Sequence, residues 1–273
     1  MNKHFLALAA TLLLAASAHA QQSLHHALEV TLDPAQNSIS VQDTLTLPAT
    51  LATVTPGQRE YEFQLNANLI LDSLQGSNFR IEPMQNEPDP ASSNGSAADA
   101  GRTIAPANHY RLLLSDDSEQ VTLSYSGHVY ADAEQLTAEY AQSFSSTTGI
   151  IGERGVYLDH SSMWVPDFEA GLMTFTMEVD FAGAAAGWTA VSQGESEGRE
   201  NFWASAQPME EIYLIAADFT TYRMPYRSSV ASATDANGEV EMLAYLRNPD
   251  PNLATRYLDA TERYLALYEP MLG

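Results

Sequence analysis

The first regular pattern along the chain is an alternation of apolar and polar residues over positions 24–47. The apolar positions form two evenly spaced runs: Leu28, Val30 and Leu32, then Ile39, Val41, Leu45 and Leu47. The residues between them, Asp33-Pro34-Ala35-Gln36-Asn37, have the composition of a turn. Because successive side chains of a strand point to opposite faces, the pattern predicts a β-hairpin of two half-buried strands.

Similar runs recur along most of the chain, each bounded by Gly, Asn, Asp or Ser. The further predicted strands are residues 60–65, 69–74, 109–114, 121–129, 156–158, 172–181, 188–192, 201–204 and 211–222. Many short strands with turn residues between them favour two packed antiparallel sheets. We therefore expect a mainly β fold, an antiparallel β-sandwich that occupies residues 21–248.

Two segments interrupt this pattern. Residues 83–108 are rich in Pro, Asn, Ser, Ala, Asp and Gly, and they carry too little apolar surface to offset their ordering entropy. This composition predicts a flexible loop inserted between two strands; a linker between separate domains is the alternative. Residues 131–144 are rich in Ala, Glu and Gln, and they predict a short helix or an irregular crossing.

The last predicted element is a helix over residues 249–273. Asp250 suits the N-cap, and Pro251 suits the first helical position. Apolar residues then recur at alternating steps of four and three: Leu253, Tyr257, Ala260, Tyr264, Leu267 and Met271. Such a stripe is expected to pack on other protein surface, and a sandwich with one helix offers little of it. We therefore expect the chain to stop before the element that would cover the stripe.

Residues 1–20 have the three-part layout of a secretion signal. Lys3 lies near the start, an apolar run follows over 5–16, and Ala18-His19-Ala20 has the small residues that signal peptidase requires. The apolar run is shorter than the roughly 20 residues that span a bilayer. We expect cleavage after Ala20 and a periplasmic or secreted protein.

Composition excludes several kinds of chemistry. The 273 residues contain no cysteine, so disulfides, thiolate zinc sites and a cysteine nucleophile are excluded. Twelve Lys and Arg stand against 35 Asp and Glu, a formal net charge of −23, and Lys3 is the only lysine. A field of this sign repels phosphate backbones and anionic lipid head groups. We therefore expect the mature protein to bind neither nucleic acids nor membranes.

The second half of the chain contains a series of short motifs. They are Gly155-Val156-Tyr157-Leu158, Trp164-Val165-Pro166, a strand from Leu172 to Val179, Trp188-Thr189-Ala190-Val191-Ser192-Gln193-Gly194, Trp203, Pro208-Met209 and Glu211-Ile212-Tyr213-Leu214-Ile215-Ala216-Ala217-Asp218-Phe219. Over these residues the chain resembles the amino-terminal domain of the M1 (gluzincin) family of zinc aminopeptidases, in its exported bacterial form. The resemblance implies a saddle-like β domain, and residues 253–272 resemble the first helix of the family's catalytic domain.

The resembled family removes amino-terminal residues from peptides, and its chemistry lies downstream of that helix. A Gly-x-Met-Glu-Asn strand holds the substrate amine, and His-Glu-x-x-His with a distant Glu binds zinc. Neither motif occurs in the 273 residues, and no two of the seven histidines have the four-residue spacing of a zinc-binding helix. We therefore expect no catalytic, cofactor-binding or metal-binding residue in this chain; the zinc would belong to a catalytic domain outside it.

Two polar groups invite other interpretations. His25-His26 could bind a metal, but adjacent side chains of a strand point to opposite faces, which favours an exposed or edge-strand pair. Asp159-His160-Ser161-Ser162 contains the residues of a hydrolase triad. Triad members normally come from separate loops, so a polar turn before Trp164 is the preferred interpretation.

The remaining candidates are acidic pairs and tryptophans. Glu210-Glu211 and Asp116-Asp117 could act as paired carboxylates of a glycosidase, but in a chain this acidic they indicate surface charge. Trp164, Trp188 and Trp203 could form a sugar-stacking platform, although core or sheet-face packing is more common for tryptophan in β-sandwiches.

The sequence thus predicts the non-catalytic β domain of an exported M1-like metallopeptidase, inactive alone, which would meet a peptide substrate only when joined to a catalytic domain. The alternative is a self-contained periplasmic module that binds a small ligand or partner protein. In that alternative the terminal helix folds back and buries its stripe on a sheet. Helix-mediated self-association is a further expectation.

Overall fold

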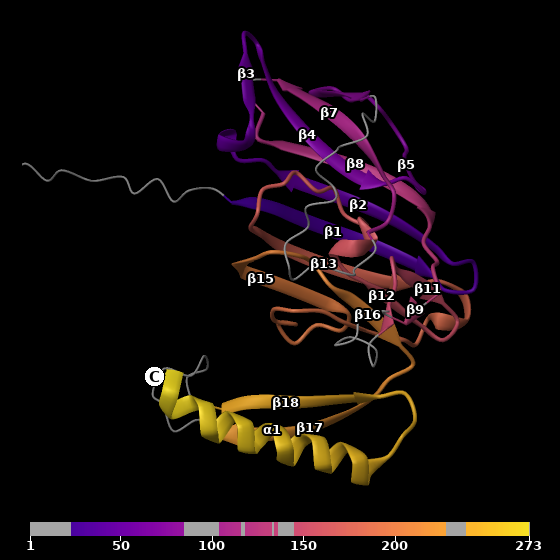
Figure 1. The fold of residues 1–273 in the computed structure, drawn as a ribbon, viewed down its shortest axis with the longest axis vertical. Coiled ribbons are helices and arrows are strands. Elements are labelled where there is room, and N and C mark those ends of the chain that lie inside the picture. The colour runs from indigo at the N-terminus through magenta and orange to yellow at the C-terminus, as the bar shows by residue number, and fades with distance from the viewer. Residues whose placement is uncertain are drawn as a thin grey trace, which may run out of the picture.

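The structure is a computed structural model that describes residues 23–84, 104–115, 118–132, 134–135, 145–227 and 239–272. It is mainly β, as predicted, with a single long helix at the end of the described chain (Figure 1). Most of the predicted inserted loop, residues 85–103, and most of the predicted helical segment, residues 136–144, lie outside the described residues.

The predicted opening hairpin consists of β1 (Leu24–Asp33) and β2 (Ser38–Thr46). Its strands pair antiparallel from His25↔Thr46 to Asp33↔Ser38. The turn ends at Asn37, whose φ of 53° lies in the left-handed region that Asn tolerates better than most residues. The apolar positions of both strands are buried, so the alternation predicted the buried face correctly.

The hairpin lies at the centre of a six-stranded sheet with the order β15-β13-β1-β2-β8-β5. The other strands are β5 (Leu69–Leu71), β8 (Gln120–His128), β13 (Met173–Phe181) and β15 (Phe202–Met209). One pair departs from the antiparallel pattern, because β1 and β13 run parallel from Leu24↔Met173 to Leu32↔Phe181. These strands are far apart in sequence, so a long connection replaces a hairpin turn.

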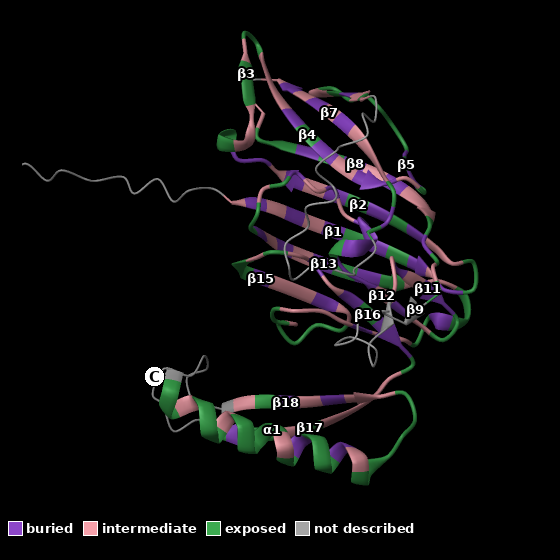
Figure 2. Cartoon of the chain, viewed as in Figure 1, coloured by how far each residue is buried: buried purple, intermediate pink, exposed green. Residues whose placement is uncertain are grey.

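A four-stranded sheet with the order β3-β4-β7-β6 packs over the first. Its strands are β3 (Thr53–Thr55), β4 (Gln58–Asn66), β6 (Phe79–Pro83) and β7 (Ala107–Ser115). A short 3-10 turn, Ala49–Leu51, precedes β3. Buried positions alternate with more exposed ones along β4 and β7 (Figure 2).

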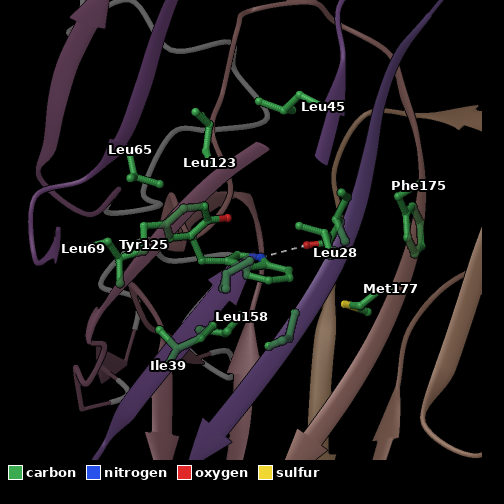
Figure 3. Packing of buried hydrophobic residues seen from close by; sticks show 14 of the residues in the cluster. Leu28, Ile39, Leu45, Leu65, Leu69, Leu123, Tyr125, Leu158, Phe175 and Met177 are labelled. Carbon is green, nitrogen blue, oxygen red and sulfur yellow. Dashed lines mark hydrogen bonds between the residues drawn. The ribbon is translucent and has the colours of Figure 1, made fainter. Parts of the chain in front are cut away.

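The inner faces of these sheets share one hydrophobic core. It includes Leu28 and Val41 from the first sheet and Phe63 and Leu112 from the second. Figure 3 shows a part of this core in which Tyr125 lies among leucines. Burying one large apolar side chain contributes about 1.5–3 kcal/mol. The core therefore supplies stability that disulfides cannot supply in a chain without cysteine.

A third sheet extends the sandwich, with the order β11-β12-β16-β14. Its strands are β11 (Ile150–Gly152), β12 (Gly155–Leu158), β14 (Thr189–Val191) and β16 (Leu214–Ala217). Short 3-10 turns, His160–Ser162 and Gly183–Ala185, flank β13, and β9 (Glu134–Gln135) pairs with β10 (Ser145–Ser146). The inner face of the third sheet joins the main core through Val156, Leu158 and Leu214.

A second, smaller core lies in the last part of the described chain. Strands β17 (Thr220–Arg227) and β18 (Glu239–Leu246) form an antiparallel hairpin, and helix α1 (Pro251–Leu272) packs on it. The buried members of this core are Tyr226, Met242, Ala244 and Leu258. The predicted strand 211–222 is thus two strands, because the chain leaves the third sheet after Ala217 and enters this hairpin at Thr220.

The terminal helix forms as predicted, but its stripe faces away from the hairpin. Asp250 caps it by accepting a hydrogen bond from Leu253 N (3.0 Å). Ala254 and Leu258 are the buried positions, whereas Tyr257, Tyr264, Leu267 and Met271 are 56%, 62%, 59% and 71% exposed. The expectation that this stripe packs against protein surface is not met within the described residues, since a different face of the helix docks.

Candidate functional site

The two adjacent histidines lie on β1 and point to opposite faces of the sheet, as predicted. His26 is fully buried, and its Nδ1 lies 2.8 Å from Oδ2 of Asp43, which is also fully buried, on β2. The expectation of an exposed or edge-strand pair is therefore wrong for His26, because β1 lies between β13 and β2. His25 is partly buried and lies 2.9 Å from Oγ1 of Thr174; burial lowers the pKa of its imidazole.

Three polar atoms of this core region have no hydrogen-bond partner within the described part of the chain. They are Nε2 of His26, Oδ1 of Asp43 and Oη of Tyr125. Tyr125 comes from β8, on the other side of β2, and is also fully buried. The His26–Asp43 pair is enclosed by the sandwich core, so it is a determinant of stability and not a surface that meets a substrate.

Burial raises the pKa of the Tyr125 phenol well above its usual value of 10.0. The folded state therefore keeps this proton where the unfolded chain loses it, and stability falls as pH rises above about 10. Replacing Tyr125 with Phe is expected to reduce that fall. At neutral pH it is expected to leave stability unchanged or to raise it by about 1 kcal/mol, because an unpartnered buried hydroxyl is removed.

Urea unfolding of both proteins at pH 7 and between pH 9.5 and about 11 measures the effect, since a tyrosine ionises near pH 10 in the unfolded chain. An equal loss of stability in both proteins over that alkaline range would contradict the assignment.

The segment Asp159-His160-Ser161-Ser162 is a capped turn, as predicted. Both Asp159 carboxylate oxygens are occupied: Oδ1 accepts from Ser161 N (3.0 Å), and Oδ2 accepts from the Tyr157 hydroxyl (3.1 Å). Ser161 and Ser162 are buried, while His160 is exposed. The residues named by the triad interpretation hold the 3-10 turn together, and they do not converge as acid, base and nucleophile.

Glu211 connects this turn to the segment that leads into β16. Its Oε2 accepts from His160 N (3.0 Å), and its Oε1 accepts from the Tyr213 hydroxyl. Its neighbour Glu210 is exposed. The two side chains therefore lie in different environments and do not form a carboxylate pair; Asp116-Asp117 lies outside the described residues.

The residues Ser192-Gln193-Gly194 follow β14, and the first two bind the backbone of Tyr213, just before β16. Ser192 Oγ donates to Tyr213 O (2.6 Å), and Gln193 Oε1 accepts from Tyr213 N (2.9 Å). Gly194 has a φ of 89°, and a Cβ there would lie 2.2 Å from Ala204 O. Only glycine fits this position without a backbone shift. The motif that the resemblance singled out thus fixes the entry of β16.

Trp164 follows this turn in the sequence and packs in the main core. It is 1% exposed, and its Nε1 donates to Ile212 O (3.1 Å). Trp188 and Trp203 are partly buried and pack against the main core. The three tryptophans therefore confirm the interpretation as core and sheet-face packing.

The outer face of the third sheet is hollowed by a pocket of about 780 Å³. It is lined by the β1–β2 turn, the β11–β12 hairpin, Tyr130, Ile215, Phe219 and Arg247. A volume of this size suits a small molecule. The sequence patterns did not predict this pocket. The one pattern that could have indicated it is Gly152 and Gly155 on either side of Glu153-Arg154, because this spacing is typical of a tight hairpin at a sheet edge.

The described residues do not fit a zinc site. Nowhere in the described ranges do three or more His, Asp or Glu side chains converge in a way that could hold a metal ion. Within the same ranges, no helix has the length and apolarity to cross a bilayer.

Comparison with known proteins finds likenesses of fold only. No family model matches the sequence, and no curated protein matches it. An aminopeptidase N family protein from Idiomarina loihiensis aligns with a TM-score of 0.48 and 10% identity, over 89% of this chain and 37% of that one. The M1 zinc metallopeptidase from Deinococcus radiodurans aligns with a TM-score of 0.47 and 14% identity, over 86% and 52%.

Yeast LTA4 hydrolase in complex with bestatin aligns with a TM-score of 0.39 and 13% identity, over 73% of this chain and 29% of that one. The first two structures come from the family that residues 155–219 resemble. This chain spans well under two thirds of the length of each of the three.

Proposed function

We infer that this chain is the amino-terminal β domain of an exported, M1-like zinc metallopeptidase and that it has no peptidase activity alone. The observation that carries the proposal is the exposed stripe of α1. Tyr257, Tyr264, Leu267 and Met271 form an exposed apolar row on a helix that docks through a different face, at Leu258. Contiguous apolar surface of this kind usually marks contact with other protein.

The small size of the second core supports the same proposal. The core that the two-stranded hairpin and the helix share has four buried members in the described chain: Tyr226, Met242, Ala244 and Leu258. An isolated hairpin is marginally stable at best, and more packed surface is needed for independent stability. In the proposed enzyme the catalytic domain covers the stripe and supplies that surface.

The proposed role of the domain in the enzyme is based on the motifs that it shares with the resembled family. Trp164, Gln193 and Glu211 fix the third sheet and the turn beside it. In the proposed enzyme this domain walls one side of the active-site cleft and helps to position the amino terminus of a peptide. The zinc and the residues that activate water belong to the catalytic domain, because His-Glu-x-x-His is absent from the 273 residues.

The alternative of a self-contained binding module is not favoured. It requires α1 to fold back and bury its stripe on a sheet. The stripe is instead exposed, and the helix contacts β17 and β18, with Leu258 in the second core.

The proposal is tested with the chain expressed from its own start codon in a Gram-negative bacterium. We expect the protein in the periplasmic fraction, with Gln21 as its first residue by mass spectrometry. Assayed with aminoacyl-coumarin substrates and added zinc, it is expected to show no turnover above a mock preparation. Retention of residues 1–20 would overturn the export part, and turnover that a chelator abolishes would overturn the inactivity.

A further inference from the structure

The pocket on the outer face of the third sheet has an apolar floor that water reaches. Ile215 is 36% exposed, and Tyr130 at the rim is 52% exposed, and both line the pocket. The rings of Tyr157 and Phe219 belong to the same lining. Exposed aromatic and branched side chains in a concavity favour an apolar or aromatic body over water.

Two glycines of the β11–β12 hairpin, Gly152 and Gly155, leave room for this pocket. A Cβ at Gly152 would lie 3.3 Å from the ring of Tyr130. Gly155 has a φ of 143°, and a Cβ there would lie 3.2 Å from Ala216 O. Larger residues at these two positions would press on the rim or the floor. The hairpin that carries them therefore approaches β16 closely and still leaves the pocket open.

Arg154 lies in the turn between these glycines and provides the charge. It lines the pocket, is exposed, and has no ion-pair partner within the described ranges. The neighbouring Tyr130 hydroxyl donates to Asp132 (3.0 Å), and this hydrogen bond raises the pKa of the phenol. The second guanidinium of the lining, that of Arg247, is held by Asp218 (3.1 Å). Arg154 is thus the cation of this pocket that is free to meet a ligand.

We propose that this pocket binds a small organic carboxylate with an aromatic or branched body. The carboxylate pairs with the guanidinium of Arg154, whose forked donors match its two oxygens, and the body covers Ile215 and Tyr130. Asp132 is occupied by the Tyr130 hydroxyl, and Glu153 faces the same opening, so a doubly charged anion is disfavoured. This site does not depend on the peptidase proposal, because it is built from residues of this chain alone.

The test uses the purified mature chain and N-acetyl-L-phenylalanine as the probe, with calorimetry or NMR shifts as the readout. We expect a Kd on the order of 1 mM, as suits about 15 heavy atoms in an open pocket. N-acetyl-L-phenylalanine amide, which lacks the carboxylate, is expected to bind at least ~10-fold more weakly. Arg154→Ala is expected to weaken the acid by the same factor and to leave the amide unchanged.

Arg80→Ala is the matched control, because Arg80 is an exposed arginine on β6 away from the pocket. It is expected to keep wild-type affinity. Equal binding of acid and amide, or full affinity in Arg154→Ala, would overturn the proposal. So would the absence of saturable binding at about ten times the expected Kd. The comparison of acid with amide on the unmodified chain decides the question even if a variant fails to fold.

Discussion

Replacing Asp43 with Ala is expected to destabilise the sandwich by about 3–5 kcal/mol, because the change breaks a fully buried pair. Asp43 and His26 are both 0% exposed and lie 2.8 Å apart. Removing the carboxylate leaves a polar imidazole in the core without its partner. His26 lost its contact with water when the chain folded, and in the variant no hydrogen bond to Asp43 offsets that cost.

Urea unfolding followed by tryptophan fluorescence measures the loss. Asp180→Ala removes an exposed acid from β13 of the same sheet and is expected to change stability by no more than about 0.5 kcal/mol. The double variant His26→Leu with Asp43→Leu is expected to recover most of the loss, because apolar pairs often replace buried polar pairs without penalty. A loss of less than about 1 kcal/mol in Asp43→Ala would show that the pair is not enclosed as described.

Replacing Trp164 with Ala is expected to cost about 3–5 kcal/mol, from lost burial and from the cavity left behind. The indole is 1% exposed, packs in the main core and donates to Ile212 O (3.1 Å). Trp164→Phe keeps most of the volume and leaves the carbonyl without its donor. It is expected to cost about 1–3 kcal/mol.

Unfolding is followed here by far-ultraviolet circular dichroism, because the variants change the tryptophan signal. Trp188→Ala serves as the control: Trp188 is partly buried at the edge of the core, so its loss is expected to be smaller. Equal losses at positions 164 and 188 would contradict the deeper burial of Trp164 in the main core.

Local patterns predicted much of the secondary structure. The even spacing of apolar residues gave both strands of the opening hairpin, and the Asp250-Pro251 start with its four-three spacing gave the terminal helix. Strand β18 was missed, because its alternation is short and follows a segment without a clear pattern. The division between β16 and β17 was also missed, since an apolar run does not show where the chain changes sheets.

The candidate site was much less predictable. The family-like motifs were visible, but their role was not: Gln193 and Glu211 act through backbone groups of residues that are distant in sequence. The pocket depends on the approach of the β1–β2 turn, the β11–β12 hairpin and the end of β18. No single segment contains a signal for that meeting, because each contributes ordinary turn or strand residues.

The sequence by itself determined the features that depend on neighbouring residues: strand and helix periods, the absence of cysteine, the net charge of −23 and the absence of a His-Glu-x-x-His motif. Only the tertiary structure decided which partner each face meets. It buried His26 against Asp43, placed β1 parallel to β13, and left the Tyr257–Tyr264 face of α1 exposed while Leu258 docked. The physical reason is that a period specifies a buried face, whereas the surface that covers it comes from residues far away in the chain.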